Sequence, residues 1–160
     1  MKTILSFLKS QKNKSGITNT YHIGLLQTKA YKALMGTTSD LLNRLDISNS
    51  DWVALGTIND HSAGLRALLL SEIMGVEQPF ITVVINKLKK RGFVIVSPDP
   101  TDKRAKIIHL SKEGKAFVKQ MEANLTKEME KISAGISLPD AIGYIKVLEG
   151  IVDYSEKHSK

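Results

Sequence analysis

The sequence predicts a mainly α-helical protein with one small β-hairpin, and three observations support this fold class. Apolar residues recur at helical spacing through most of the 160 residues. Two short β-branched runs, 93–96 and 106–110, flank a charged tip that contains two prolines, a pattern typical of an antiparallel hairpin. Two helical segments also meet at Gly75 with a very short connection, which favours a helix-turn-helix.

The first two helices follow from apolar spacing and capping. Leucines and alanines repeat near helical period over about 18–45, which predicts a first helix. The sequence 48–51 has a hydroxyl three residues before an acid, and this capping signal opens a second helix. A polar break over 59–64 is expected to end it.

A third helix is expected over about 66–74 and a fourth directly after it. Gly75 ends the third helix because glycine readily takes the left-handed conformation that closes a helix. Pro79 suits the first turn of the fourth helix, where no N–H is needed. Residues at i, i+3, i+4 and i+7 place one apolar face of this helix inward: Ile81, Val84, Ile85 and Leu88.

The opposite face of the fourth helix gathers the side chains that a DNA major groove would meet. These are Pro79, Thr82, Val83, Asn86 and Lys90, with Gln78 and Lys87 on the flanks. Amide side chains can bond adenine edges, methyl groups can contact thymine, and lysines suit phosphates. An ordinary amphipathic surface helix is the alternative for this pattern taken by itself.

The hairpin is expected to carry a cationic tip. Pro98 and Pro100 should prevent strand pairing from continuing into the tip. Arg104 suits a narrow minor groove, where negative potential is concentrated. Asp102 would repel phosphate, so we expect it to hold that arginine or to tie the hairpin to the body by an ion pair. The alternative for Arg104 is a solvated loop residue.

Two more helices are expected after the hairpin. Ser111 is a good N-cap for a long helix that Gly135 ends, and the sequence 137–139 opens a last helix. Both helices carry apolar stripes at spacings of three and four. Such a stripe forms either intramolecular core or a seam between subunits.

Positive charge is concentrated on the fourth helix and the hairpin. Between Ile85 and Lys115 lie nine lysines and arginines but only three acidic residues, which accounts for most of the chain's formal net charge of +7. Such a patch favours a polyanionic partner, most commonly nucleic acid and less commonly a membrane surface. A solvated basic face without a partner is the alternative.

Several classes of protein are disfavoured. The absence of cysteine excludes disulfides, thiolate zinc sites and thiol redox sensing, and the four histidines are too scattered to predict a metal site. No catalytic or cofactor-binding motif occurs, so neither an enzyme nor a cofactor is expected. The apolar segments are too short for a signal h-region or a membrane span, and a soluble cytoplasmic protein is the expectation.

Three segments resemble the MarR/SlyA family of bacterial winged helix-turn-helix transcriptional regulators. They are 77–92, the tip PDPTDKRA at 98–105, and HLSKEGKAF at 109–117. The resemblance implies a homodimer on a pseudo-palindromic operator, with a recognition helix over about 78–91 in the major groove. It also implies a wing over about 94–110 that reaches a flanking minor groove.

The resemblance and the exposed-face argument together predict the DNA contacts. Val83 departs from the polar or basic residue that this family often has there, which implies a different operator preference. The predicted contacts are Arg66, Gln78, Pro79, Thr82, Val83, Asn86, Lys87, Lys90, Asp102, Lys103, Arg104 and Lys106.

The resemblance also implies an organisation and a signal. One MarR-type domain would comprise an N-terminal dimerisation region (1–46), a winged helix-turn-helix (47–117) and C-terminal dimerisation helices (118–160). A small aromatic effector would bind near Tyr31 and Trp52, for which plain core residues are the alternative. The function expected is a ligand-responsive repressor. The alternatives are an architectural DNA-binding protein without sequence preference and a winged-helix module that binds a protein.

Overall fold

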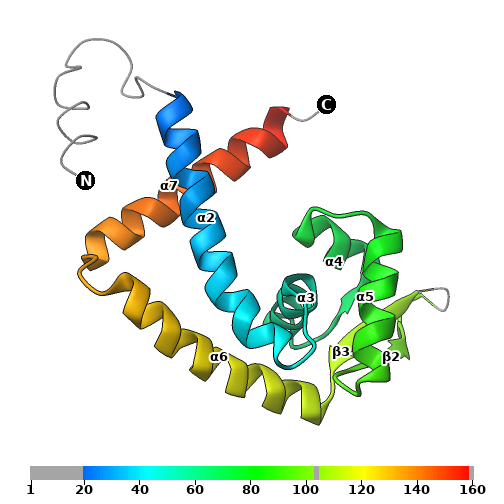
Figure 1. The fold of residues 1–160 in the computed structure, drawn as a ribbon. Helices are drawn as coiled ribbons and strands as arrows, with labels where there is room; N and C mark the ends of the chain where they lie inside the picture. The colour runs from blue at the N-terminus through cyan, green and yellow to red at the C-terminus, as the bar shows by residue number, and fades with distance from the viewer. Residues whose placement is uncertain (1–19, 103–104, 159–160) are drawn as a thin grey trace. The chain divides into compact units, whose positions relative to one another are not determined.

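The computed structural model describes residues 20–102 and 105–158, which form helices and a small sheet. The chain divides into two compact units, 1–118 and 119–160. Figure 1 labels the elements in chain order. They are α2 (Thr20–Asn43), α3 (Asn49–Asp60), β1 (Leu65–Arg66), α4 (Ala67–Met74), α5 (Gln78–Lys90), β2 (Val94–Pro98), β3 (Lys106–Leu110), α6 (Lys112–Ser133) and α7 (Leu138–His158).

The capping box predicted at the start of the second helix is confirmed. The Asp51 backbone N–H donates to the Ser48 hydroxyl at 3.1 Å, and the Ser48 backbone N–H donates to the Asp51 carboxylate at 2.8 Å. The predicted break over 59–64 begins two residues too early, because α3 continues through Asp60 and ends at His61. Polar composition alone does not interrupt the backbone hydrogen bonds of a helix.

The predicted turn between the third and fourth helices is also confirmed. Gly75 closes α4 in the left-handed conformation with φ of 64°, and a proline lies in the first turn of α5. One detail differs from the expectation, because Arg66 precedes α4 as its N-cap and belongs to strand β1. A strand of two residues has no alternation that sequence inspection could detect.

The sheet is antiparallel with the strand order β1-β3-β2. The strand β2 continues two residues past the predicted run 93–96 and ends at Pro98, which pairs with Lys106 as its last residue. At the next position the Asp99 N–H donates to the Ala105 carbonyl at 3.0 Å. Pairs in antiparallel sheets alternate between bonded and non-bonded, so the missing N–H of Pro98 falls where β3 requires no donor.

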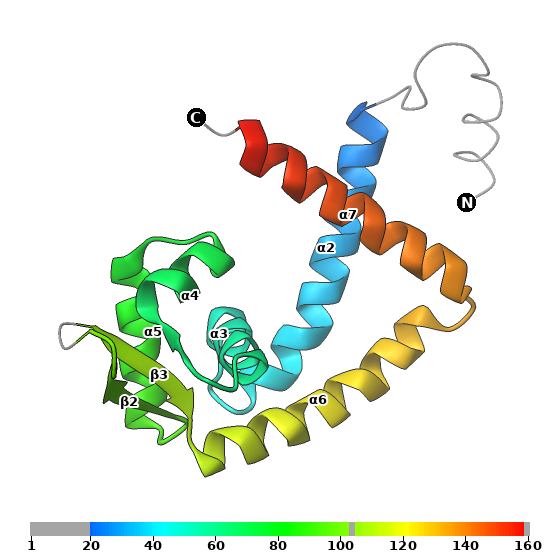
Figure 2. The same cartoon turned by 180° about the vertical axis from the view of Figure 1, so that it is seen from behind.

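The core of the first unit lies among α3, α4, α5 and the sheet. Figure 2 shows from behind that the β2–β3 hairpin runs beside α5, as it does in Figure 1. The predicted inward face of α5 is buried in full. The other buried apolar side chains of these elements are Ala54, Leu55, Ile58, Leu65, Leu70, Val94, Ile108 and Leu110.

The two last helices have the predicted ends. The Ser111 hydroxyl accepts the Gly114 N–H at 2.9 Å, as an N-cap does, and Gly135 follows α6 with φ of 87°. No residue of α7 is buried in the single chain. Among the described residues, no single helix is long and apolar enough to span a membrane, and the α4–α5 pair, bent by 110°, reaches such length and composition only when both helices are combined.

An ion pair between a buried carboxylate and a partly exposed lysine joins α3 to α5. The Asp51 side chain is only 2% exposed, and its carboxylate accepts from the Lys87 ammonium at 2.7 Å. Burial raises the pKa of Asp51, but hydrogen bonds from Lys87 and Ser48 lower it by more, so the net pKa is below its ordinary value. Asp51 is therefore charged in the folded protein at neutral pH.

A second cation fixes the end of α5. The Arg91 guanidinium donates to the backbone carbonyls of Asp46 at 2.6 Å and Leu45 at 2.9 Å. Both acceptors lie in the connection between α2 and α3, where carbonyls would otherwise lack partners. The recognition-helix candidate is thus attached to the start of the winged-helix segment by two cationic side chains.

We expect Lys87→Ala to destabilise the fold by about 1–3 kcal/mol, because the Asp51 carboxylate stays buried after it loses its charged partner. Lys90→Ala is the matched control, since Lys90 lies on the same helix but is exposed. The free energy of unfolding of the Lys90→Ala variant should change by no more than about 0.5 kcal/mol. Urea unfolding followed by circular dichroism measures both. Equally small changes in the two variants would show that the ion pair does not stabilise the fold.

The lowered pKa of Asp51 predicts a pH-dependent stability. A carboxyl whose pKa is lower in the folded chain stabilises the fold above its unfolded pKa and loses this effect as the pH falls through the folded value. We expect Asp51→Asn to be less stable than the unchanged chain at neutral pH by about 1–3 kcal/mol. The difference should shrink as the pH falls below 3.8. Urea unfolding of both chains over a series of pH values measures this difference in free energy of unfolding. A difference that stayed constant as the pH fell would contradict the prediction.

Candidate nucleic-acid interface

The exposed face of α5 presents most of the predicted contacts. Burial of the opposite face determines which side chains point outward. Val83 is 67% exposed in spite of its apolar side chain. The predicted residues that lie exposed on α5 are Gln78, Pro79, Thr82, Val83, Asn86 and Lys90.

Lys87 lies apart from this exposed group. Its side chain is 39% exposed and its ammonium is engaged by the Asp51 carboxylate. A phosphate contact by Lys87 stays a prediction, and such a contact would compete with the internal ion pair.

A groove separates α5 from the hairpin. A pocket of about 200 Å³ lies between them, lined from α5 by Thr82, Asn86 and Lys89 and from β3 by Lys106. A neighbouring hollow of about 170 Å³ continues along the hairpin and is again bordered by Lys89 and Lys106. Two lysines on opposite walls make this groove suitable for a phosphate backbone.

Lys89 is a residue that the sequence predictions missed. It is exposed and it borders both hollows. Its position, three residues after Asn86 and seven after Thr82, places it on the same helical stripe as these two predicted contacts. Extending that stripe by one more turn would have identified it.

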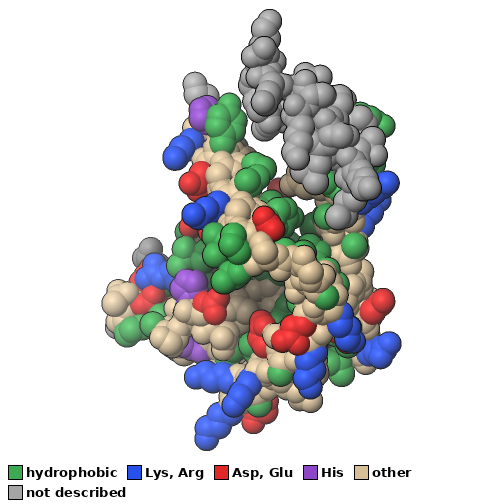
Figure 3. All heavy atoms as spheres, turned by 90° about the vertical axis from the view of Figure 1, so that its left-hand side faces the viewer, with side chains coloured by type: hydrophobic (Ala, Val, Ile, Leu, Met, Phe, Trp, Pro, Cys, Tyr) green, Lys and Arg blue, Asp and Glu red, His purple; other side chains and the backbone are tan. Residues whose placement is uncertain are grey.

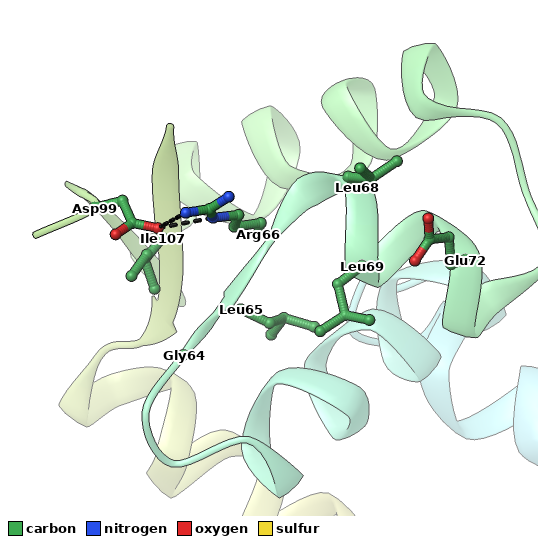
Figure 4. A pocket seen from close by; sticks show the side chains of 8 residues that line it. All are labelled: Gly64, Leu65, Arg66, Leu68, Leu69, Glu72, Asp99 and Ile107. Carbon is green, nitrogen blue, oxygen red and sulfur yellow. Dashed lines mark hydrogen bonds and ion pairs between the residues drawn. The ribbon is translucent and has the colours of Figure 1, made fainter. Parts of the chain in front are cut away.

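An ion pair ties the hairpin to the body. Figure 4 shows the Arg66 guanidinium directed at the Asp99 carboxylate, and the shortest distance between them is 2.6 Å. Hydrogen bonds from the Thr101 hydroxyl and backbone, together with a smaller effect of Arg66, outweigh desolvation and lower the pKa of Asp99 to about 2. Asp99 thus ties the hairpin to the body of the protein by an ion pair. The sequence analysis had suggested this role for Asp102.

The remaining predicted wing residues that the structure describes differ in how exposed they are. Asp102 is partly buried and makes an interaction of its own, while Lys106 is exposed at the first position of β3. Lys103 and Arg104 lie outside the described residues. Their contacts with DNA stay predictions.

The predicted effector residues lie on the two helices expected for them. Tyr31 is 62% exposed on α2, and Trp52 is partly buried on α3. A pocket formed by these residues stays a prediction. Within 20–102 and 105–158, no group of three or more histidine, aspartate or glutamate side chains is arranged to hold a metal ion.

Comparisons with known proteins agree with this geometry. Residues 47–106 match the model of the MarR family. A mutant of MarR from E. coli in complex with operator DNA has a similar structure, with a TM-score of 0.72, 18% identity and coverage of 82% of this chain and 94% of that one.

Two proteins that bind or respond to a small molecule have a similar fold. CouR from Rhodococcus jostii RHA1, bound to p-coumaroyl-CoA, gives a TM-score of 0.75 at 20% identity and covers 82% of this chain and 92% of its own. The DNA binding of BpsR from Bordetella bronchiseptica is regulated by 6-hydroxynicotinic acid. Its structure gives a TM-score of 0.70 at 20% identity, and the match covers 82% of this chain and 98% of BpsR. The match over 47–106 and the shared fold agree with the resemblance: residues 47–106 match the model of the MarR family, and the chain has the winged helix-turn-helix fold of these solved structures.

Proposed function

We propose that the protein is a sequence-specific double-stranded DNA-binding transcriptional regulator that acts in the cytoplasm as a homodimer on a pseudo-palindromic operator. The observation that carries this proposal is the groove between α5 and the hairpin, which has Lys89 on one wall and Lys106 on the other. A polar helix face beside a cationic groove combines base recognition with phosphate binding.

The roles of the side chains follow from their positions. Gln78 and Asn86 can bond adenine edges, and Thr82 and Val83 can contact thymine methyl groups. Lys89, Lys90 and Lys106 lie where phosphates would pass and would set the register of the duplex without choosing its sequence. Sequence choice is then a property of the exposed face of α5.

The exposed surface of α7 supports a homodimer. Apolar side chains of this helix that are at least half exposed in the single chain include Ile145, Ile151 and Val152. Hydrophobic side chains also reach the surface on the face drawn in Figure 3. Burial of such side chains by a second copy would remove apolar area from water at about 25 cal/mol per Å². A dimer would also place two recognition helices on two half-sites.

A repressor that responds to a small aromatic effector is the regulatory form of this proposal. CouR binds p-coumaroyl-CoA and BpsR responds to 6-hydroxynicotinic acid, and both ligands contain an aromatic ring. Tyr31 and Trp52 offer aromatic surface on α2 and α3. An effector that binds the DNA-free state more tightly would shift the protein away from its operator.

A winged-helix module that binds a protein is the second candidate function. It is favoured by the apolar side chains on the surface of α5, since Val83 is 67% exposed and Phe80 is 42% exposed. Exposed apolar groups of this kind are frequent at protein interfaces. Binding experiments with DNA separate the two candidates.

Selection of bound duplexes from a random pool at about 150 mM salt tests the proposal, followed by affinity titrations against scrambled DNA. We expect a two-fold-symmetric site with half-sites about one helical turn apart, bound roughly 10³-fold more tightly than scrambled duplex. Binding without enrichment would indicate an architectural protein. Absence of binding in the effector-free protein would favour the protein-binding module.

We expect Lys89→Ala to weaken binding to operator and scrambled duplexes alike, because a phosphate contact carries no sequence information. The slope of log affinity against log salt should fall by about 1. Lys127→Ala is the control, since it removes one exposed lysine of α6 and the same formal charge. Fluorescence anisotropy over a salt series measures both. If the two variants kept the same slope, Lys89 would not contact DNA.

A further inference from the structure

Arg66 and Asp99 join two parts of the chain that are 33 residues apart in the sequence. Arg66 belongs to β1 and directly precedes α4, while Asp99 follows the last residue of β2. The Arg66 Nε and Nη2 atoms lie 2.7 Å and 2.6 Å from the same oxygen of Asp99. The Asp99 side chain is only 5% exposed whereas the Arg66 side chain is 47% exposed, so the carboxylate is shielded from water and the guanidinium is shielded only in part.

The other carboxylate oxygen of Asp99 organises the start of the hairpin tip. It accepts the Thr101 backbone N–H at 2.7 Å and the Thr101 hydroxyl at 2.6 Å. The Asp99 backbone N–H donates to Ala105 on the other side of the tip at 3.0 Å. One buried carboxylate therefore connects the backbone of the tip to β1, and through β1 to the start of α4.

We propose that Asp99 and Arg66 are positioning residues for DNA recognition, whose ion pair sets the direction in which the β2–β3 hairpin leaves the body of the protein. This inference rests on the proposed function and adds a role to it. Arg66 then acts on DNA through the hairpin, because its guanidinium is engaged by a buried carboxylate.

The surroundings of Arg66 support this role. Figure 4 shows Arg66 pointing toward Asp99 and away from Glu72, the other acidic residue that lines the same pocket of about 330 Å³. The Arg66 Nε donates to Asp99 and its Nη2 forms an ion pair with the same carboxylate oxygen, and two such contacts restrict the guanidinium to one orientation. A hairpin of two strands is marginally stable by itself, so an anchor at the base of its tip limits how far it can swing.

The sign of the expected effect separates this role from simple electrostatics. Asp99→Asn removes a negative charge close to a surface proposed to bind a polyanion, and charge alone would make DNA binding tighter. If Asp99 positions the hairpin, the same substitution makes binding weaker. The asparagine side chain is nearly isosteric and can still accept from Thr101, so the shape of the tip is disturbed little.

The test compares two duplexes that carry the operator found by selection. One duplex includes the flanking base pairs that the hairpin would reach, and the other ends at the half-sites. We expect Asp99→Asn to lower affinity for the flanked duplex by about tenfold and to leave affinity for the short duplex within about twofold. Arg66→Lys should behave similarly, because lysine keeps the charge for a phosphate but lacks the two-pronged geometry.

A measurement without DNA reports the position of the hairpin directly. The chain has no cysteine, so Asn59→Cys and Pro100→Cys can carry two spin labels at exposed sites on α3 and on the tip. Double electron–electron resonance gives the distribution of distances between them. We expect a narrow distribution that broadens when Asp99→Asn is added, with an unchanged circular dichroism spectrum that excludes unfolding.

Failure of the inference and failure of the proposed function give different results. If the unchanged chain binds no operator, the proposed function fails, while the distance distributions still test the position of the hairpin. Three results would overturn the inference in a chain that binds its operator: unchanged or tighter binding of the flanked duplex by Asp99→Asn, equal losses on both duplexes, or an unbroadened distribution. An Arg66→Lys variant that binds like the unchanged chain would instead assign Arg66 to a phosphate contact.

Discussion

The rest of the winged helix depends on the burial of one face of α5. Ile81, Val84, Ile85 and Leu88 lie on one side of this helix and are all buried, which determines how the helix is rotated about its own axis. The rotation of the helix in turn determines the direction in which every other side chain of α5 points. The polar face, the lysine beside the groove and the cations that turn back to the body all follow from this constraint.

The cations of α5 and Arg91, which follows it, consequently have different partners although they are close in sequence. Lys87 contacts a buried carboxylate and Arg91 donates to two backbone carbonyls, whereas Lys89 and Lys90 remain exposed. A count of positive charge along the sequence therefore overstates how many cations a polyanion can reach. The long stems of cationic side chains lie over apolar surface, and their charged ends donate to a buried acceptor when one lies within reach.

Two aspartates stabilise the two elements proposed to contact DNA. Asp51 connects α5 to α3, and Asp99 connects the hairpin to β1. Each is almost fully buried and has a lowered pKa, because hydrogen bonds compensate for the loss of water around the charge. A rigid support of this kind is what a binding surface needs in order to present side chains in one geometry.

The sequence by itself determined which segments form helices, most of the helix ends and the inward face of α5. The capping box at Ser48 and the left-handed Gly75 act within a few residues of the chain, so local patterns are sufficient to find them. Only the tertiary structure decided that Arg66 belongs to a strand, that Asp99 anchors the hairpin and that Lys87 turns inward. Each of these depends on a partner more than 30 residues away, and a contact between distant segments leaves no periodic signal in the sequence.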